Sequence, residues 1–201
     1  MGRPRSWDEP TVLAAAVAVF RRKGHAGTSL REVERATGLH PGSLYQRFGN
    51  KSGLFAAALA AYTDDVVSQR VKLHLESAPD ALAGIHSFFT STFATGIEPE
   101  PGCLLTNTAI EAYSLDPALR EGVRQGLALL ERGLAGAVRR AQTARQIPPE
   151  VDADAVAAQL LAIYQGVLVL VRLGTPEPKL AALTGAAVDA ITGQEPKGER
   201  P

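Results

Sequence analysis

Residues 27–51 read GTSLREVERATGLHPGSLYQRFGNK, and this stretch decides the fold. Ser29 and Glu32 form a capping box that opens a short helix, and Gly38 ends that helix. Pro41 fits the first turn of a second short helix, because the N–H that proline lacks has no partner at that position anyway. Two short helices joined through a glycine turn are typical of a helix-turn-helix.

The second short helix has one apolar and one polar face. Leu44 and Phe48 are four residues apart and are expected to face inward. Ser43, Gln46 and Arg47 then lie on the outer face, where a recognition helix meets base edges in the major groove. Glutamine and arginine are suited to bidentate contacts with adenine and guanine. The alternative interpretation is that both helices are ordinary amphipathic members of a bundle.

Helical patterns continue on both sides of this stretch. Ser6 and Glu9 form a second capping box, which predicts a helix that ends at Gly24. Asn50 caps a longer helix that runs to about Leu75. Further helices are predicted at about 80–93, 103–113, 117–144, 152–173 and 178–193.

This pattern predicts an all-α protein of about nine helices, without strand-like alternation. We expect the helix-turn-helix to belong to an N-terminal three-helix domain, residues 1–56, that binds DNA. A larger helical domain is expected at 57–193, and the family resemblance described below assigns ligand binding and dimerisation to it. The polar residues 194–201 are predicted to be a disordered tail.

Charge is distributed unevenly along the chain. Residues 1–55 carry nine Lys/Arg and four Asp/Glu (9 − 4 = +5), and residues 56–201 carry twelve and seventeen (12 − 17 = −5). A basic N-terminal part on an acidic remainder fits a polyanion-binding domain attached to a second domain.

The single cysteine excludes a disulfide within the chain and fits a reducing cytosol. The most apolar run, 162–171, is too short to span a bilayer, and no signal peptide is visible, so we expect a cytoplasmic protein without a membrane partner.

Catalytic and metal-binding patterns are missing from the sequence. The four histidines are scattered without cysteine or carboxylate partners at ligand spacing, which predicts no metal and no cofactor. We find no nucleophile–base pair, no glycine-rich phosphate loop after a strand and no carboxylate pair in an apolar context. The chain is therefore not expected to be an enzyme.

Four segments closely resemble the DNA-binding signature of the TetR family over about residues 10–56: GTSLREV (27–33), ATGL (36–39), GSLY (42–45) and FGNK (48–51). The resemblance implies a homodimer in which Tyr45 and Lys51 hold phosphates of double-stranded DNA while the outer face of the second helix meets bases. Arg47 stands where the family commonly has histidine. The expected DNA-binding residues are Ser29, Ser43, Tyr45, Gln46, Arg47 and Lys51.

A shorter segment, Gly102-Cys103-Leu104-Leu105-Thr106-Asn107, resembles one subgroup of the family in the regulatory domain. Cys103 would lie at a helix N-terminus, where the helix dipole favours a thiolate. Two interpretations stay open: a reactive sensor, or a small residue packed in the core. The candidate ligand pocket comprises Phe88, Phe89, Phe93, Cys103, Asn107, Tyr164 and Gln165; the alternative is that its phenylalanines are simply core.

The last two predicted helices carry apolar stripes. In the TetR family this pair forms the dimer interface, so we expect that interface at Leu161, Val167, Leu170, Leu183 and Ala187. The resemblance thus predicts a transcriptional repressor that a small apolar or reactive effector releases from a palindromic operator. The alternative is a DNA-binding protein without an effector, in which the helical domain serves only for dimerisation.

Overall fold

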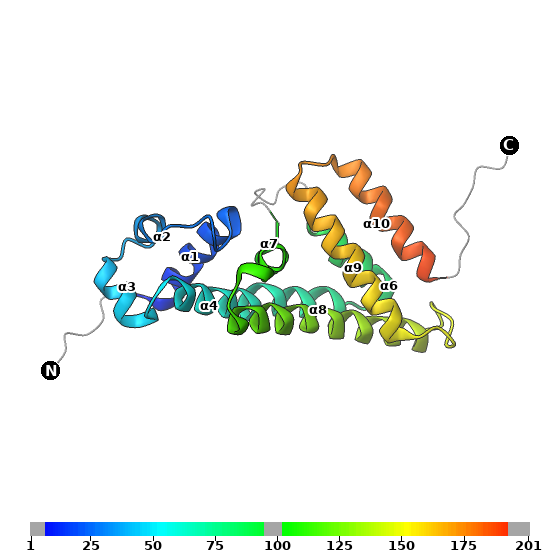
Figure 1. Ribbon diagram of the computed structural model, residues 1–201. Helices are drawn as coiled ribbons and strands as arrows, with labels where there is room; N and C mark the ends of the chain where they lie inside the picture. The colour runs from blue at the N-terminus through cyan, green and yellow to red at the C-terminus, as the bar shows by residue number, and fades with distance from the viewer. Residues whose placement is uncertain (1–6, 95–101, 193–201) are drawn as a thin grey trace. The chain divides into compact units, whose positions relative to one another are not determined.

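The computed structural model of the protein describes residues 7–94 and 102–192 (Figure 1). All regular elements in these two ranges are helical, which confirms the predicted all-α class. The predicted cap Ser6, the segment 95–101 between two predicted helices and the predicted tail at 194–201 lie outside the described residues. The chain divides into two compact units: residues up to 66 together with 103–126, and residues 67–102 together with those from 127 on.

The first unit contains the helix-turn-helix. Its helix α1 packs against α2 and α4, and α3 packs against α4. Phe20 on α1 and Phe55 on α4 are fully buried and meet edge to face, with ring centroids 4.7 Å apart. Its elements are α1 (Glu9–Lys23), α2 (Leu30–Thr37), α3 (Pro41–Phe48), α4 (Lys51–Tyr62), α7 (Leu104–Ile110), the 3₁₀ turn η3 (Ala112–Ser114) and the first part of α8 (Pro117–Thr143).

The start of α1 differs from the prediction. Asp8 is the N-cap residue, and its carboxylate accepts a 3.0 Å hydrogen bond from the backbone N–H of Thr11. The same carboxylate accepts a 2.6 Å bond from the Thr11 hydroxyl. The N-cap of α1 is therefore Asp8 and not the predicted Ser6, and the helix begins two residues later than expected.

The predicted helix from Asn50 to Leu75 is also not a single α-helix. Asn50 caps α4 as expected, through a 2.9 Å bond from the backbone N–H of Gly53. Beyond α4 the chain passes through a π-helical segment η1 (Thr63–Val67), a short α5 (Ser68–Arg70) and a second π-helical segment η2 (Val71–Glu76). A π turn accommodates an extra residue, and this change of period leaves no clear mark in an apolar pattern.

The second unit contains α5, η2, α6 (Ala81–Thr90), the later part of α8, α9 (Ala153–Arg172) and α10 (Glu177–Ile191). Here α6 packs against η2 and α10, and α10 packs against α9. Arg140 on α8 closes the end of η2, because its guanidinium donates to the carbonyls of Leu75 (2.7 Å), Glu76 (2.8 Å) and Ala78. The helix predicted to carry Phe93 ends at Thr90, so Phe93 lies in the turn that follows.

Helix α9 has 20 residues and is therefore longer than the apolar run at 162–171 that it contains. An 18-residue window of α9 has a mean hydropathy of 1.8, so its length and composition alone would allow it to cross a membrane. Core helices of soluble proteins meet the same criterion. In this unit α9 buries Leu160, Tyr164 and Val167.

Candidate nucleic-acid interface

The turn between α2 and α3 is set by backbone conformation. Gly38 adopts a left-handed conformation (φ 68°, ψ 9°), and its N–H donates to the Glu34 carbonyl at 2.9 Å, which ends α2. At the start of α3, the His40 carbonyl accepts the N–H groups of Ser43 (3.0 Å) and Leu44 (3.3 Å). No side chain caps α3, so Pro41 in its first turn and the backbone alone define where the recognition helix begins.

The two faces of α3 differ as its pattern predicts. Leu44 is 3% exposed and is the buried residue of the helix. Tyr45 is 47% exposed, and Gln46 and Arg47 are also exposed. Ser43 and Phe48 are half-buried. The outer face of α3 therefore presents a phenol, an amide and a guanidinium to solvent.

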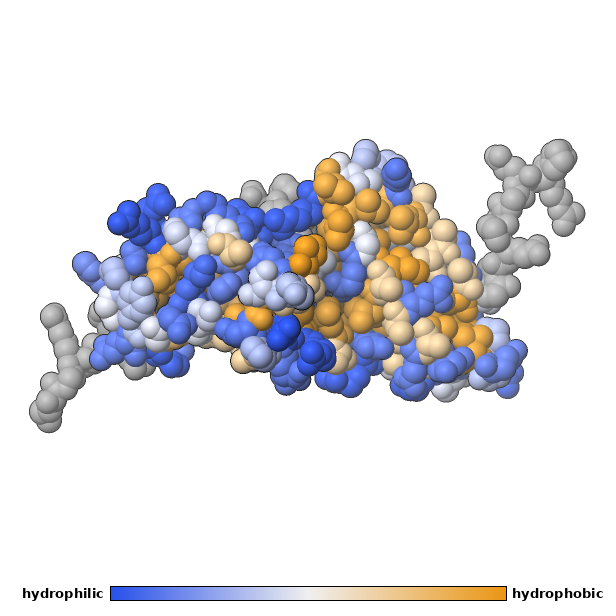
Figure 2. Space-filling view, viewed as in Figure 1, coloured by the Kyte–Doolittle hydropathy of each residue, from blue (hydrophilic) through white to orange (hydrophobic). Residues whose placement is uncertain are grey.

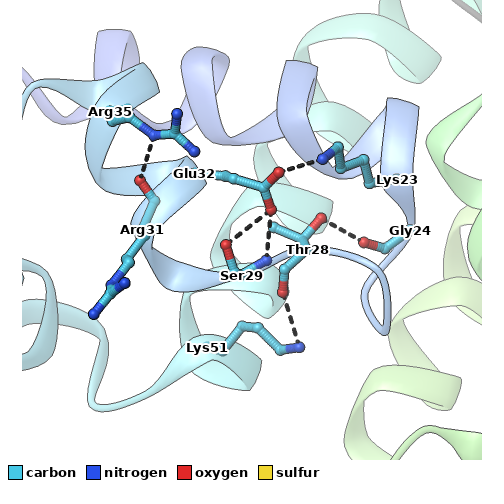
Figure 3. Close-up of polar contacts among 8 residues, drawn as sticks. All are labelled: Lys23, Gly24, Thr28, Ser29, Arg31, Glu32, Arg35 and Lys51. Carbon is cyan, nitrogen blue, oxygen red and sulfur yellow. Dashed lines mark hydrogen bonds and ion pairs between the residues drawn. The ribbon is translucent and has the colours of Figure 1, made fainter.

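The loop before α2 is held by Lys51, the first residue of α4 (Figure 3). The Lys51 ammonium donates to the carbonyls of His25 (2.9 Å) and Thr28 (3.1 Å). The Thr28 hydroxyl in turn donates to the Gly24 carbonyl at 2.7 Å. Lys51, expected to hold a phosphate, thus also fixes the loop that positions α2, and one of its three N–H groups remains for an anion.

The imidazole of His25 lies in the same loop. Burial and, to a smaller extent, the Lys51 charge lower the pKa of His25, and the charges of Glu111 and Asp116 oppose this shift. The imidazole and the Phe55 ring pack edge to face, with ring centroids 5.0 Å apart. A neutral His25 therefore adds no positive charge to this part of the surface at neutral pH.

The capping box at the start of α2 is present. The Glu32 carboxylate accepts the backbone N–H and the hydroxyl of Ser29, both at 2.9 Å, and pairs with Lys23 of α1. These contacts lower the pKa of Glu32 to about 2, and the contact with Lys23 contributes most to the shift. Ser29, expected to contact DNA, is exposed and has its hydroxyl directed to Glu32 (Figure 3).

Arg47 has a partner that the sequence analysis missed. Its Nε donates to Oε2 of Glu9 at 3.0 Å, and its Nη2 donates to Oε1 of Glu9 at 2.7 Å. The pair raises the pKa of Arg47. Glu9 stands in the first turn of α1, 38 residues away in sequence, so no local spacing could have indicated the contact.

Within the first unit, α7 is attached to the end of α1. The Asn107 amide donates to the Arg21 carbonyl at 2.9 Å, and the Glu111 carboxylate accepts the N–H of Ala26 at 3.0 Å. Asn107, expected in a ligand pocket, is 7% exposed and makes this contact within the first unit. Cys103 precedes α7 at its N-cap position and is 6% exposed.

The other candidate pocket residues belong to the second unit. Phe88 and Phe89 are fully buried, and Tyr164 is 3% exposed. The Tyr164 ring lies 4.6 Å from that of Phe88 and 5.6 Å from that of Phe89. Arg70 donates to the Phe88 carbonyl at 3.0 Å and to the Tyr164 hydroxyl at 3.4 Å. The remaining two candidates, Phe93 and Gln165, are half-buried.

The residues expected in a dimer interface divide into two groups. Val167 is fully buried and packs inside the second unit, so it has no surface to offer a partner. The other four are half-buried, so part of each side chain is accessible: Leu161, Leu170, Leu183 and Ala187.

Within residues 7–94 and 102–192, no three His, Cys, Asp or Glu side chains are grouped so that they could hold a metal ion.

Comparison with protein families gives two matches that together span most of the chain. Residues 12–58 match the family of bacterial regulatory proteins, tetR family. Residues 79–191 match the tetracyclin repressor-like C-terminal domain. The first match contains the whole helix-turn-helix, and the second covers more than half of the chain.

Individual relatives agree with these matches. The HTH-type transcriptional repressor ComR of Escherichia coli is 30% identical over 190 residues, which are 93% of this chain and 90% of ComR. A cysteine mutant of the TetR family transcriptional regulator CifR, solved in complex with 26-bp double-strand operator DNA, superimposes with a TM-score of 0.83. That match has 29% identity and covers 94% of this chain and 100% of CifR. The helix-turn-helix, the two family matches and these relatives agree: the chain belongs to the TetR family of bacterial transcriptional regulators.

Proposed function

We propose that this protein is a cytoplasmic, ligand-responsive repressor that binds a palindromic operator as a homodimer. A small molecule, apolar or reactive, releases it from the DNA. The observation that carries the proposal is the outer face of α3, on which Tyr45, Gln46 and Arg47 are exposed while Leu44 anchors the helix. A short helix with this division of faces fits the major groove. CifR, solved on operator DNA, and ComR, a repressor, support the assignment.

The effector site is proposed in the second unit, around the rings of Phe88, Phe89 and Tyr164. These rings supply an apolar wall, and the Tyr164 hydroxyl and the Arg70 guanidinium supply polar groups beside it. An effector acts only if it binds the conformation that is incompatible with DNA more tightly than the other. The burial of Cys103 favours a reversible apolar effector over a reactive one.

Dimerisation is proposed through α9 and α10. Apolar side chains gather over these two helices on the face shown in Figure 2. Val169 is 38% exposed and Leu173 is 74% exposed at the surface of this region. Two recognition helices related by a dyad require half-sites separated by about one helical turn of DNA, ~34 Å, or a multiple of it.

The test is a gel shift on DNA selected from a random pool. Tyr45→Phe should weaken binding to operator and to unrelated DNA alike, because a phosphate contact carries no sequence information. Tyr113→Phe is the matched control, since Tyr113 is 99% exposed in η3 and lies in the same unit. Gln46→Ala should instead change which bases are tolerated. If neither variant differs from the parent, the assignment of α3 is wrong.

Effector control is tested separately from DNA binding. Small apolar compounds are screened for release of the parent protein from its operator, and active compounds are then tested on Cys103→Ser. Release of both proteins supports a reversible effector, and release of the parent alone supports a reactive one. Protein that no compound releases supports the alternative, in which the second unit serves only for dimerisation.

A further inference from the structure

The ion pair between Arg47 and Glu9 joins the recognition helix to the first turn of α1. Two parallel hydrogen bonds, 3.0 Å and 2.7 Å long, connect one edge of the guanidinium to both carboxylate oxygens. Bidentate pairs of this kind fix the orientation of the arginine as well as its position. The Arg47 side chain is 41% exposed and that of Glu9 is 32% exposed, so the pair lies at the surface.

The surroundings hold both partners in place. Asp8 caps α1, so Glu9 is not needed as an N-cap. The Cζ of Arg47 lies 5.4 Å from the ring centroid of Phe48, whose ring in turn lies 6.5 Å from that of Trp7. Contact with an aromatic ring further restricts the plane of a guanidinium.

The remaining donors of Arg47 are arranged for a second bidentate contact. A guanidinium has five N–H groups, and the Glu9 carboxylate accepts a hydrogen bond from the N–H of Nε and from one N–H of Nη2. Both N–H groups of Nη1 and one of Nη2 are left, and Nη1 and Nη2 together form an edge with two parallel donors. Guanine offers two acceptors, O6 and N7, at the spacing that such an edge fits.

We propose that Glu9 is a specificity-determining residue of the operator-binding surface: it orients Arg47 so that the Nη1–Nη2 edge reads a guanine in each half-site. This inference rests on the proposed function. Glu9 acts as a positioning residue because its carboxylate touches Arg47, and the DNA meets Arg47. The pair has no net charge, so Arg47 serves here as a directed donor and adds little to general attraction for phosphates.

The experiment measures binding of the full chain to a selected operator and to operators in which each base pair is changed symmetrically. The parent should prefer guanine at one position per half-site. Arg47→Ala should reduce that preference by roughly 5- to 150-fold. Arg47→Lys should lose it as well, because lysine keeps the charge but not the planar two-donor edge.

Glu9→Gln is the decisive variant. It should relax the preference at the same base pair by several-fold while binding to unrelated DNA becomes tighter, since a negative charge is removed. In the Arg47→Ala background, Glu9→Gln should have no further effect on discrimination. Glu121→Gln is the matched control, because Glu121 is also paired with an arginine, Arg124, on the surface of the same unit.

The outcomes distinguish failure of the proposed function from failure of the role of Glu9. If the parent selects no preferred DNA, the proposed function fails and the inference fails with it. If the parent has an operator but Glu9→Gln discriminates as well as the parent, only the inference is overturned. If Glu9→Gln tightens binding to every operator equally and Arg47→Ala leaves the guanine preference intact, Glu9 merely repels DNA. Thermal unfolding of each variant verifies that it is folded.

Discussion

Replacement of Gly24 by alanine should destabilise the first unit through two separate effects. Gly24 follows α1 with φ 71° and ψ 179°, a conformation that only glycine adopts readily. A side chain forced into it costs of order 1–3 kcal/mol. In addition, the new Cβ would overlap a carboxylate oxygen of Glu111.

The second effect can be estimated from the bond that Glu111 makes. Its carboxylate accepts the Ala26 N–H at 3.0 Å, and displacement by the new methyl group would break this contact. Hydrogen bonds to charged groups contribute about 1.5–3 kcal/mol, and the exposure of this one places it at about 1 kcal/mol. The total expected for Gly24→Ala is therefore about 3 kcal/mol.

Gly38→Ala is the control, because Gly38 also has a positive φ, 68°, but no atom lies within 4 Å of the added Cβ. It should cost about 1 kcal/mol. Urea unfolding followed by fluorescence is the assay, since Trp7 is the only tryptophan and belongs to the first unit. In a Glu111→Ala background, the loss of unfolding free energy caused by Gly24→Ala should fall to the contribution of the strained backbone conformation alone. A Gly24→Ala variant as stable as Gly38→Ala would refute the reasoning.

Three further results are expected. The pKa of Glu32 is lowered from its ordinary value of 4.5 to about 2, so the stabilisation from its contacts is complete above pH 4.5 and is lost as the pH falls through about 2. Glu32→Gln should therefore reduce the loss of stability in this pH range, which circular dichroism measures. Phe88→Ala removes a fully buried ring and should cost about 3–5 kcal/mol in urea unfolding; a cost below 1 kcal/mol would contradict its place in the core. Leu161→Asp with Leu183→Asp should yield monomers in sedimentation, whereas Leu73→Asp, at a position 66% exposed, should leave the oligomeric state unchanged.

The limits of α2, α3 and the start of α4 could be predicted because their signals are local. A glycine at 38 and an asparagine at 50 act on atoms within four residues, so the sequence alone contains the necessary information. The buried Leu44 and the exposed Gln46 and Arg47 follow from the helical period in the same way.

Contacts between distant segments could not be predicted in this way. Glu9 meets Arg47 across 38 residues, and Asn107 meets the Arg21 carbonyl across 86. Such pairs depend on how helices pack, and many other pairings fit the same charges. The resemblance of residues 102–107 to a subgroup of the family does not indicate that the Asn107 amide holds α7 to α1.

The anchoring of α3 also bears on how such a protein diverges over time. The helix is too short to persist alone, since isolated helices below about 12 residues are marginal in water, and Leu44 is its one buried residue. Substitutions at exposed positions away from special contacts usually change stability by less than about 0.5 kcal/mol. Gln46 can therefore mutate freely without loss of the fold, while a change at Arg47 also leaves Glu9 without its bidentate partner. After gene duplication, preference for a new promoter would therefore arise most readily through substitution of Gln46. Substitution of Arg47 would be tolerated best together with a substitution of Glu9.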